Sequence, residues 1–234
     1  MPGITELLPR IKWLWHVQRD DVEREADTLC EMTAQRLSAL AGSKYGGRIG
    51  KIKAFEALND LRSIFDVKWG GFGAVPKLPE AHKLLFLLRM SRANSGASNR
   101  DKSDAFTMTD ITLRRMWRGG IHDHLGGGFS RYAIDESWLV PHFEKLLADQ
   151  AMLLLAVSQA QELQNNSFHR LFAEDIIFCT TKYFCEDASY SQGFKSSVCG
   201  DTQEGEGRYY LWTYDEIKSI LPENLGGLFC AAYA

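Results

Sequence analysis

Residues 119–144 carry most of the side chains in this sequence that could do chemistry. Glycines, histidines, an arginine, carboxylates and aromatic rings follow one another here without a helical or strand pattern. Glycine lets the backbone pass close to a ligand or to another segment, and binding residues concentrate on loops held by a rigid scaffold. We therefore expect this segment to line a binding site.

His142 is the first candidate for a proton-transferring side chain. Pro141 suits the first turn of a helix, where the positive end of the helix dipole keeps a nearby imidazole neutral. On such a helix Asp149 lies two turns further along the same face, whereas Glu144 points about 200° away from His142. We predict His142 as a catalytic base beside Asp149; a hydrogen-bonded core histidine is the structural alternative.

Arg131 and Asp135 flank Tyr132 and allow two interpretations. They form an ion pair that braces the loop, or they hold a sugar that stacks on a nearby aromatic ring. Aromatic faces beside carboxylates and an arginine are typical of ligand clefts of this kind. We therefore predict a catalytic role for Arg131. The predicted substrate-binding residues in this part are Tyr132, Asp135 and Trp138.

The tripeptide His122-Asp123-His124 invites a metal site completed by His142. Histidines two residues apart share a metal only on extended backbone, and the carboxylates that orient metal-bound histidines are missing from the pattern. We expect no metal and assign His122 and Asp123 to hydrogen bonding, with a substrate or within the loop. The glycine patterns of nucleotide-binding loops are also missing, so no cofactor is predicted.

A second glycine-rich segment, Gly70–Gly73, precedes Lys77. Glycine is common where a helix ends, which gives this segment a purely structural interpretation. The functional alternative is a pocket-lining loop from which Lys77 contacts a ligand.

The composition is that of an ordinary folded protein and excludes several classes of function. The 234 residues are 45% apolar and 24% charged, and the net charge of −3 provides no basic field for nucleic acid or an anionic membrane. No apolar stretch reaches the ~20 residues of a membrane-spanning helix, and the first residues lack the pattern of a signal peptide. We expect a small molecule as partner, and neither nucleic acid nor a membrane.

Five cysteines are scattered along the chain without a CxxC pair. Their positions are Cys30, Cys179, Cys185, Cys199 and Cys230. An odd, dispersed set indicates reduced thiols of an intracellular chain, and neither a disulfide framework nor a structural zinc site. The sequence does not indicate a particular compartment.

Helical periodicity dominates the chain and predicts an all-α fold with short β-hairpins. The expected helical segments are 20–40, 54–65, 81–88, 103–118, 141–154, 167–183 and 213–221. Their expected N-caps are Asp20, Ser167 and Thr213. Short strands are expected at 208–212 and in a hairpin within 129–139. About seven helices in pairs form a bundle, a solenoid or an α/α toroid.

Several short, unusual strings of residues follow one another along this sequence. They are Gly-Gly-Phe-Gly and Pro-Lys-Leu-Pro within 70–79, Gly-Gly-Ile, Gly-Gly-Gly-Phe and Arg-Tyr within 119–132, and Trp with Pro-His-Phe-Glu-Lys within 138–145. In this order they resemble the signatures of the spermatogenesis-associated protein 20 family. That family joins an N-terminal thioredoxin-like domain to a six-hairpin α/α toroid similar to those of sugar epimerases and glycosidases.

The resemblance implies the domain organisation. Residues 1–45 become a linker and first helix that follow a thioredoxin-like domain missing from this chain. Residues 46–234 become the N-terminal half of the toroid, so the expected fold is an incomplete (α/α)6 toroid. We expect a fragment or a truncated product whose open helix faces allow self-association.

The chain departs from the family signatures at several positions. Leu78 replaces a phenylalanine, and His122, His124 and Ser130 replace Tyr, Gln and His. Of the family's acidic string only Asp201 remains, and we add Asp201 to the predicted substrate-binding residues. The loss of the other acidic residues lowers the expected activity.

Two functions follow from these observations. The first is a carbohydrate-binding or carbohydrate-processing fragment, related to epimerases, isomerases or glycosidases, in which His142, Asp149 and Arg131 act on a sugar. Glycoside hydrolysis needs two carboxylates at a defined separation, and the sequence offers too many to select a pair. The alternative is a noncatalytic interaction module of a thioredoxin-containing protein with a redox-regulatory role.

Overall fold

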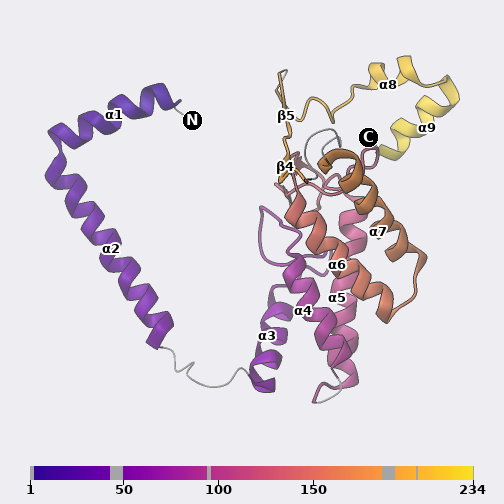
Figure 1. The fold of residues 1–234 in the computed structure, drawn as a ribbon, viewed down its shortest axis with the longest axis horizontal. Helices are drawn as coiled ribbons and strands as arrows, with labels where there is room; N and C mark the ends of the chain where they lie inside the picture. The colour runs from indigo at the N-terminus through magenta and orange to yellow at the C-terminus, as the bar shows by residue number, and fades with distance from the viewer. Residues whose placement is uncertain (1–2, 43–49, 94–95, 186–192, 204, 234) are drawn as a thin grey trace. The chain divides into compact units, whose positions relative to one another are not determined.

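The computed structural model describes residues 3–42, 50–93, 96–185, 193–203 and 205–233, and these are mostly helical (Figure 1). The chain divides into two compact units, Met1–Gly50 and Lys51–Ala234. The first contains α1 (Ile4–Val17) and α2 (Arg19–Gly42). The helices of the second unit are α3 (Lys51–Ile64), α4 (Ala81–Arg92), α5 (Asn99–Arg118), α6 (Leu147–Leu163), α7 (Ser167–Cys179), α8 (Tyr214–Ile220) and α9 (Glu223–Tyr233).

The strands of the second unit form three short antiparallel pairs. The pairs are β1 (Tyr132–Ala133) with β2 (Pro141–His142), β3 (Lys145–Leu146) with β4 (Ser197–Val198), and β5 (Asp201–Thr202) with β6 (Gly205–Glu206). A π-helical turn, η1 (Thr180–Phe184), continues α7. The prediction of a helical chain with short hairpins is confirmed.

Helices α1 and α2 expose all or part of every side chain that the structure describes in them. Leu29 and Leu37, which mark the predicted apolar face of α2, are 64% and 61% exposed. The predicted cap Asp20 is wrong, because α2 begins at Arg19. No helix in the described ranges is long and apolar enough to cross a bilayer.

Two helical hairpins, α4–α5 and α6–α7, form the core of the second unit and pack together through α4 and α6 (Figure 1). Their facing sides bury apolar side chains without exposed surface, among them Leu84, Leu88, Leu113, Val157 and Ile176. Each such burial stabilises the fold by roughly 1.5–3 kcal/mol. This core is the rigid scaffold from which the loops at one end are built.

Helix boundaries follow local capping chemistry. Ser98 accepts from the amide of Asp101 and completes a capping box, so α5 begins four residues before the predicted start. The cap of α7 is Asn166, which accepts from the amide of Phe168, and the prediction of Ser167 is wrong. The predicted capping box of Thr213 and Glu216 is confirmed.

The segment that follows Pro141 is extended, and the prediction that a helix begins there is wrong. Pro141 and His142 pair with Ala133 and Tyr132, and α6 begins only at Leu147. Tertiary contacts hold this backbone in place, since the amide of Ile134 donates to the carbonyl of Val140 at 2.9 Å. The helix-dipole argument for a neutral His142 therefore fails.

The predicted strand at 208–212 is also wrong, because this segment forms turns that end at the cap of α8. Gly207, at φ +73°, starts the turns beneath the ring of Phe143, where a Cβ atom would meet that ring at 2.2 Å. The aromatic residues that follow are released from sheet pairing and face a groove.

Candidate functional site

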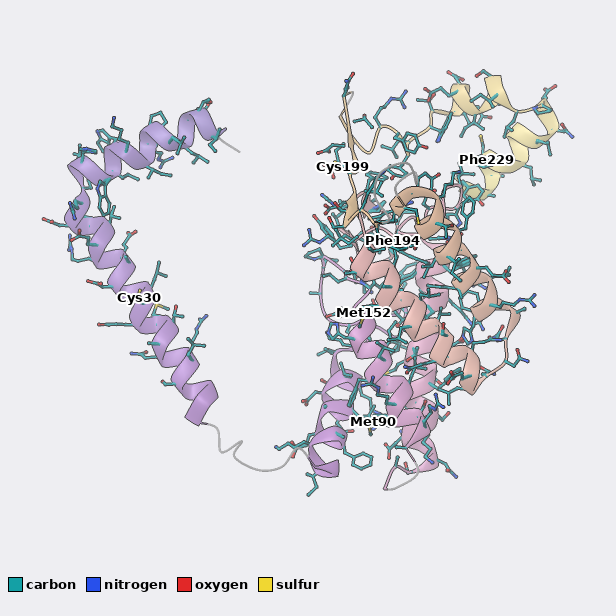
Figure 2. All side chains as sticks on the ribbon, in the orientation of Figure 1. Cys30, Met90, Met152, Phe194, Cys199 and Phe229 are labelled. Carbon is teal, nitrogen blue, oxygen red and sulfur yellow. The ribbon has the colours of Figure 1, made fainter. Side chains whose placement is uncertain are left out.

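A groove of about 980 Å³ lies beside the loop of residues 119–128 in the second unit. Its walls also include η1, the turns at 208–212 and α9. Phe229 on α9 and Cys199 beside β5 mark the end of the unit at which these segments lie (Figure 2). The aromatic lining residues are Phe143, Tyr183, Tyr209, Tyr210, Trp212, Phe229 and Tyr233. The principal polar lining residues are His122, Asp123, His124, Arg208 and Glu216.

Lys145 anchors the loop of residues 119–128 through two hydrogen bonds. Its side chain is 2% exposed, and its Nζ donates to Asp123 Oδ2 and to the Gly127 carbonyl, each at 2.7 Å. Burial alone raises the pKa of Asp123, but the Lys145 ammonium and the backbone amides that donate to the carboxylate lower it below 3.8 overall. Asp123 is therefore a charged brace of the loop as well as a groove residue.

The three consecutive glycines of this loop allow it to lie directly on α6 and α7. A Cβ atom at Gly128, whose φ is +76°, would come within 2.5 Å of Cys179 Sγ. The Gly128 amide donates to Asp175 Oδ2 at 2.7 Å, and Gln150 bonds both the amide and the carbonyl of Phe129. Close packing explains the glycines without a bound nucleotide.

His122 is buried between two aromatic rings. It stacks on Trp117 and Phe129 with ring centroids 4.1 Å and 4.9 Å away. Its Nδ1 faces the Trp117 carbonyl and its Nε2 faces Asp175 Oδ2, both at 3.1 Å. These hydrogen-bond partners lie on α5 and α7, so His122 ties the loop to two helices rather than bonding within it. Within the described ranges no three His, Cys, Asp or Glu side chains are grouped as metal ligands.

His142 lies outside the groove lining. On β2 its ring stacks on Tyr132 at 4.8 Å, and its Nε2 is 3.5 Å from Glu206 Oε1. Tyr132 is likewise no groove residue. The two predicted residues therefore contact each other rather than the space beside the loop.

Arg131 and Asp149 line a second, smaller cavity of about 280 Å³, together with His82. Arg131 Nη1 pairs with Glu144 Oε2 at 3.3 Å, so the predicted alternative of an Arg131–Asp135 ion pair is wrong. Burial raises the pKa of Asp149, and Glu144 adds to that rise while Arg131 opposes it. The structure thus brings two of the three predicted catalytic residues together, but without His142.

Trp138 and Asp135 have structural roles. The Trp138 indole has no exposed surface and donates from Nε1 to the Trp69 carbonyl at 2.8 Å, so its face cannot stack on a sugar as predicted. Asp135 accepts from the amides of Ser137, Leu139 and Val140 and closes the turn between β1 and β2. The brace interpretation therefore describes Asp135.

Two further sequence candidates also lie away from the groove. Asp201 is exposed on β5, although its neighbour Thr202 lines the groove. Lys77 is buried and donates to Asp66 Oδ2 at 2.5 Å and to the Glu136 carbonyl at 2.8 Å, so it cannot reach a ligand. Lys77 thus joins the 66–77 segment to the loop before Trp138.

Sequence reasoning missed the aromatic wall of the groove. Its signal was present in Tyr209–Trp212, but β-propensity favoured a strand there. Tyr209 and Trp212 are 64% and 50% exposed and Tyr233 is 55% exposed, so their rings are accessible. Burial raises the pKa of Tyr210 to about 12, and its hydroxyl therefore remains a donor at neutral pH. The groove therefore combines accessible aromatic faces with hydrogen-bonding groups.

The sequence of this chain is similar to those of curated proteins. No family model matches the chain. Spermatogenesis-associated protein 20 is 33% identical over 232 residues in human and 38% identical over 232 residues in rat, in each case over 96% of this chain. The chain spans 29% of the length of each of these curated relatives. This chain is therefore homologous to a part of spermatogenesis-associated protein 20, and the homology covers 96% of this chain.

Proposed function

We propose that the groove binds a carbohydrate or a similar polyhydroxylated small molecule. The observation that carries this proposal is that the accessible rings of Tyr209, Trp212 and Tyr233 line the same groove as the polar side chains of Asp123 and His124. Aromatic faces bind the apolar side of a sugar ring, and a few placed polar groups bind its hydroxyls. Arg208 and Glu216, which form an ion pair at 2.7 Å, also line the groove and add charged groups to it.

The finer fold proposal is that the two helical hairpins belong to an α/α toroid. The packing of hairpin α4–α5 on hairpin α6–α7 supports it, because an α/α toroid repeats such a unit around a ring. The structure of a longer homologue tests this proposal. Equivalent hairpins without further hairpins beside them would contradict it.

Ligand-observed NMR with D-glucose, D-mannose, D-galactose and N-acetyl-D-glucosamine tests the binding proposal. We expect millimolar dissociation constants and a tenfold loss of affinity in Trp212→Ala, about 1.4 kcal/mol. Trp13→Ala is the matched control, since Trp13 is an exposed tryptophan of α1 outside the groove. Failure of every sugar to bind, or equal affinity in Trp212→Ala and wild type, would contradict the proposal.

A second candidate function, self-association, is favoured by the apolar stripe of α1. Ile4, Leu8, Ile11 and Trp15 follow helical spacing and are between 44% and 71% exposed. Sedimentation velocity across a concentration series tests this function. We expect Leu8→Glu to remain monomeric and Thr5→Glu to associate like wild type; a monomeric wild type would exclude the function.

A further inference from the structure

His124 is held in one tautomer at the edge of the groove. Its Nε2 lies 3.2 Å from the Gly119 carbonyl, which can only accept, so Nε2 carries the ring proton. The neutral ring therefore keeps its lone pair on Nδ1. Among the residues that the structure describes, no group hydrogen-bonds to this Nδ1. The side chain is exposed and lines the groove, so Nδ1 is available to a ligand.

His122 places a second ring beside His124, with centroids 4.4 Å apart. Both nitrogens of His122 face acceptors, the Trp117 carbonyl and the Asp175 carboxylate, and neither acceptor can donate a proton. Both contacts are hydrogen bonds only when the His122 ring carries two protons. When it carries both protons, His122 is a cation next to His124, held between Trp117 of α5 and Asp175 of α7.

The surroundings of His124 oppose a second positive charge there. Partial burial of the ring lowers the pKa of His124 below 6.5, and His122 adds to this effect. The Gly119 carbonyl, Asp123 and Asp175 act in the opposite direction but do not outweigh it. From α9 the ring of Tyr233 packs against His124 with centroids 5.2 Å apart. The titratable and charged groove groups on the remaining elements are Tyr183, Arg208, Tyr209, Tyr210 and Glu216.

We propose that His124, through Nδ1, is the hydrogen-bond acceptor that fixes one hydroxyl of the ligand, and that its protonation weakens binding. This inference rests on the proposed carbohydrate-binding function and names the residue that makes binding depend on pH. A bound sugar displaces the water that would solvate a second charge beside His122, so the bound state favours the neutral ring. The affinity for the sugar has its full value above the pKa of His124, where the ring is neutral, and falls as the pH drops through that pKa.

The experiment measures the dissociation constant of the tightest sugar of the panel at pH 7.5 and at pH 5.5. Because the pKa of His124 lies below 6.5, we expect binding by wild type to be weaker at pH 5.5 than at pH 7.5, by less than about tenfold, or roughly 1.4 kcal/mol. His124→Asn keeps an acceptor that does not titrate, so at both pH values its affinity stays near the value of wild type at pH 7.5. His124→Ala loses about tenfold at pH 7.5, again roughly 1.4 kcal/mol, and shows no pH dependence.

Two measurements keep the outcomes separate. His16→Asn, on α1 and outside the groove, is the matched control and retains the wild-type pH profile. Nitrogen-15 NMR of the imidazoles reports the tautomer directly, and a proton on Nδ1 of neutral His124 would overturn the inference. Sugar binding that is independent of pH, or unchanged in His124→Ala, overturns the role of His124 but leaves the groove as the binding site. No sugar binding by wild type overturns both proposals.

Discussion

The second unit uses the same contact twice, with different consequences. His122 lies between the Trp117 carbonyl and Asp175, and His169 lies between the Gln164 carbonyl and Asp110. In each case the carbonyl belongs to the fifth residue before the histidine. The two pairs run in opposite directions between the α5 region and α7, since Asp175 is on α7 and Asp110 is on α5.

The surroundings of the two pairs differ. His169 has no exposed surface, its Nδ1 contact is longer at 3.4 Å, and Arg114 also binds its aspartate. His122 is almost as buried, but its neighbour His124 opens to the groove. One pair therefore joins α5 and α7 within the core, whereas the other lies beside the proposed ligand site. The two histidine–aspartate pairs make the same contact and differ in whether a groove lies beside them.

The largest effect is expected from breaking the contact between His169 and Asp110, the core pair. His169→Ala removes a fully buried ring and leaves Asp110 without one partner, so we expect the free energy of unfolding to fall by about 3 kcal/mol. Urea denaturation measures this loss, and sugar affinity of the folded variant should be unchanged. Arg170→Ala, an exposed neighbour, should stay within about 0.5 kcal/mol of wild type. Reduced sugar affinity would show that the core pair also serves the groove.

The second-largest expected effect tests whether His122, unlike His169, influences the groove. His122→Phe keeps the stacking on Trp117 and Phe129 but loses both hydrogen bonds, which should cost about 2 kcal/mol in urea denaturation. The loss of the neighbouring charge should also move the pKa of His124 up toward 6.5, as followed by NMR titration. His169→Phe is the control and should leave that titration unchanged. If neither variant moves it, the two pairs are equivalent.

The smallest effect is a pH dependence of the core pair. Burial alone raises the pKa of Asp110, but bonds from His169 and Arg114 lower it below 3.8 overall. This stabilisation is present above the unfolded pKa and is lost as the pH falls through the folded one. Asp110→Asn should therefore be about 1 kcal/mol less stable than wild type at pH 7. The difference should begin to shrink below about pH 4 in urea titrations and should vanish once the pH falls through the lowered pKa of Asp110, where the folded wild-type carboxylate becomes protonated. A constant difference down to pH 2, or the same loss in exposed Asp60→Asn, would contradict this account.

Sequence patterns predicted the elements whose formation depends on local chemistry. The helical segments at 54–65, 81–88 and 167–183 overlap α3, α4 and α7 because apolar residues at helical spacing need only a neighbouring apolar face. The capping box at Thr213 needs only residues three apart, and it was predicted correctly. The segment after Pro141 was not, because its path depends on pairing with residues 132–133.

The sequence alone determined that this chain is helical, has no CxxC pair, and carries a dense loop around His122, since these properties depend on composition and local spacing. Only the tertiary structure decided which of the loop's side chains are accessible. It buried Trp138, placed His142 against Tyr132, and opened His124 to an aromatic groove. The physical reason is that burial and hydrogen-bond partners come from segments far apart along the chain, such as η1, the 208–212 turns and α9, whose meeting no local pattern encodes.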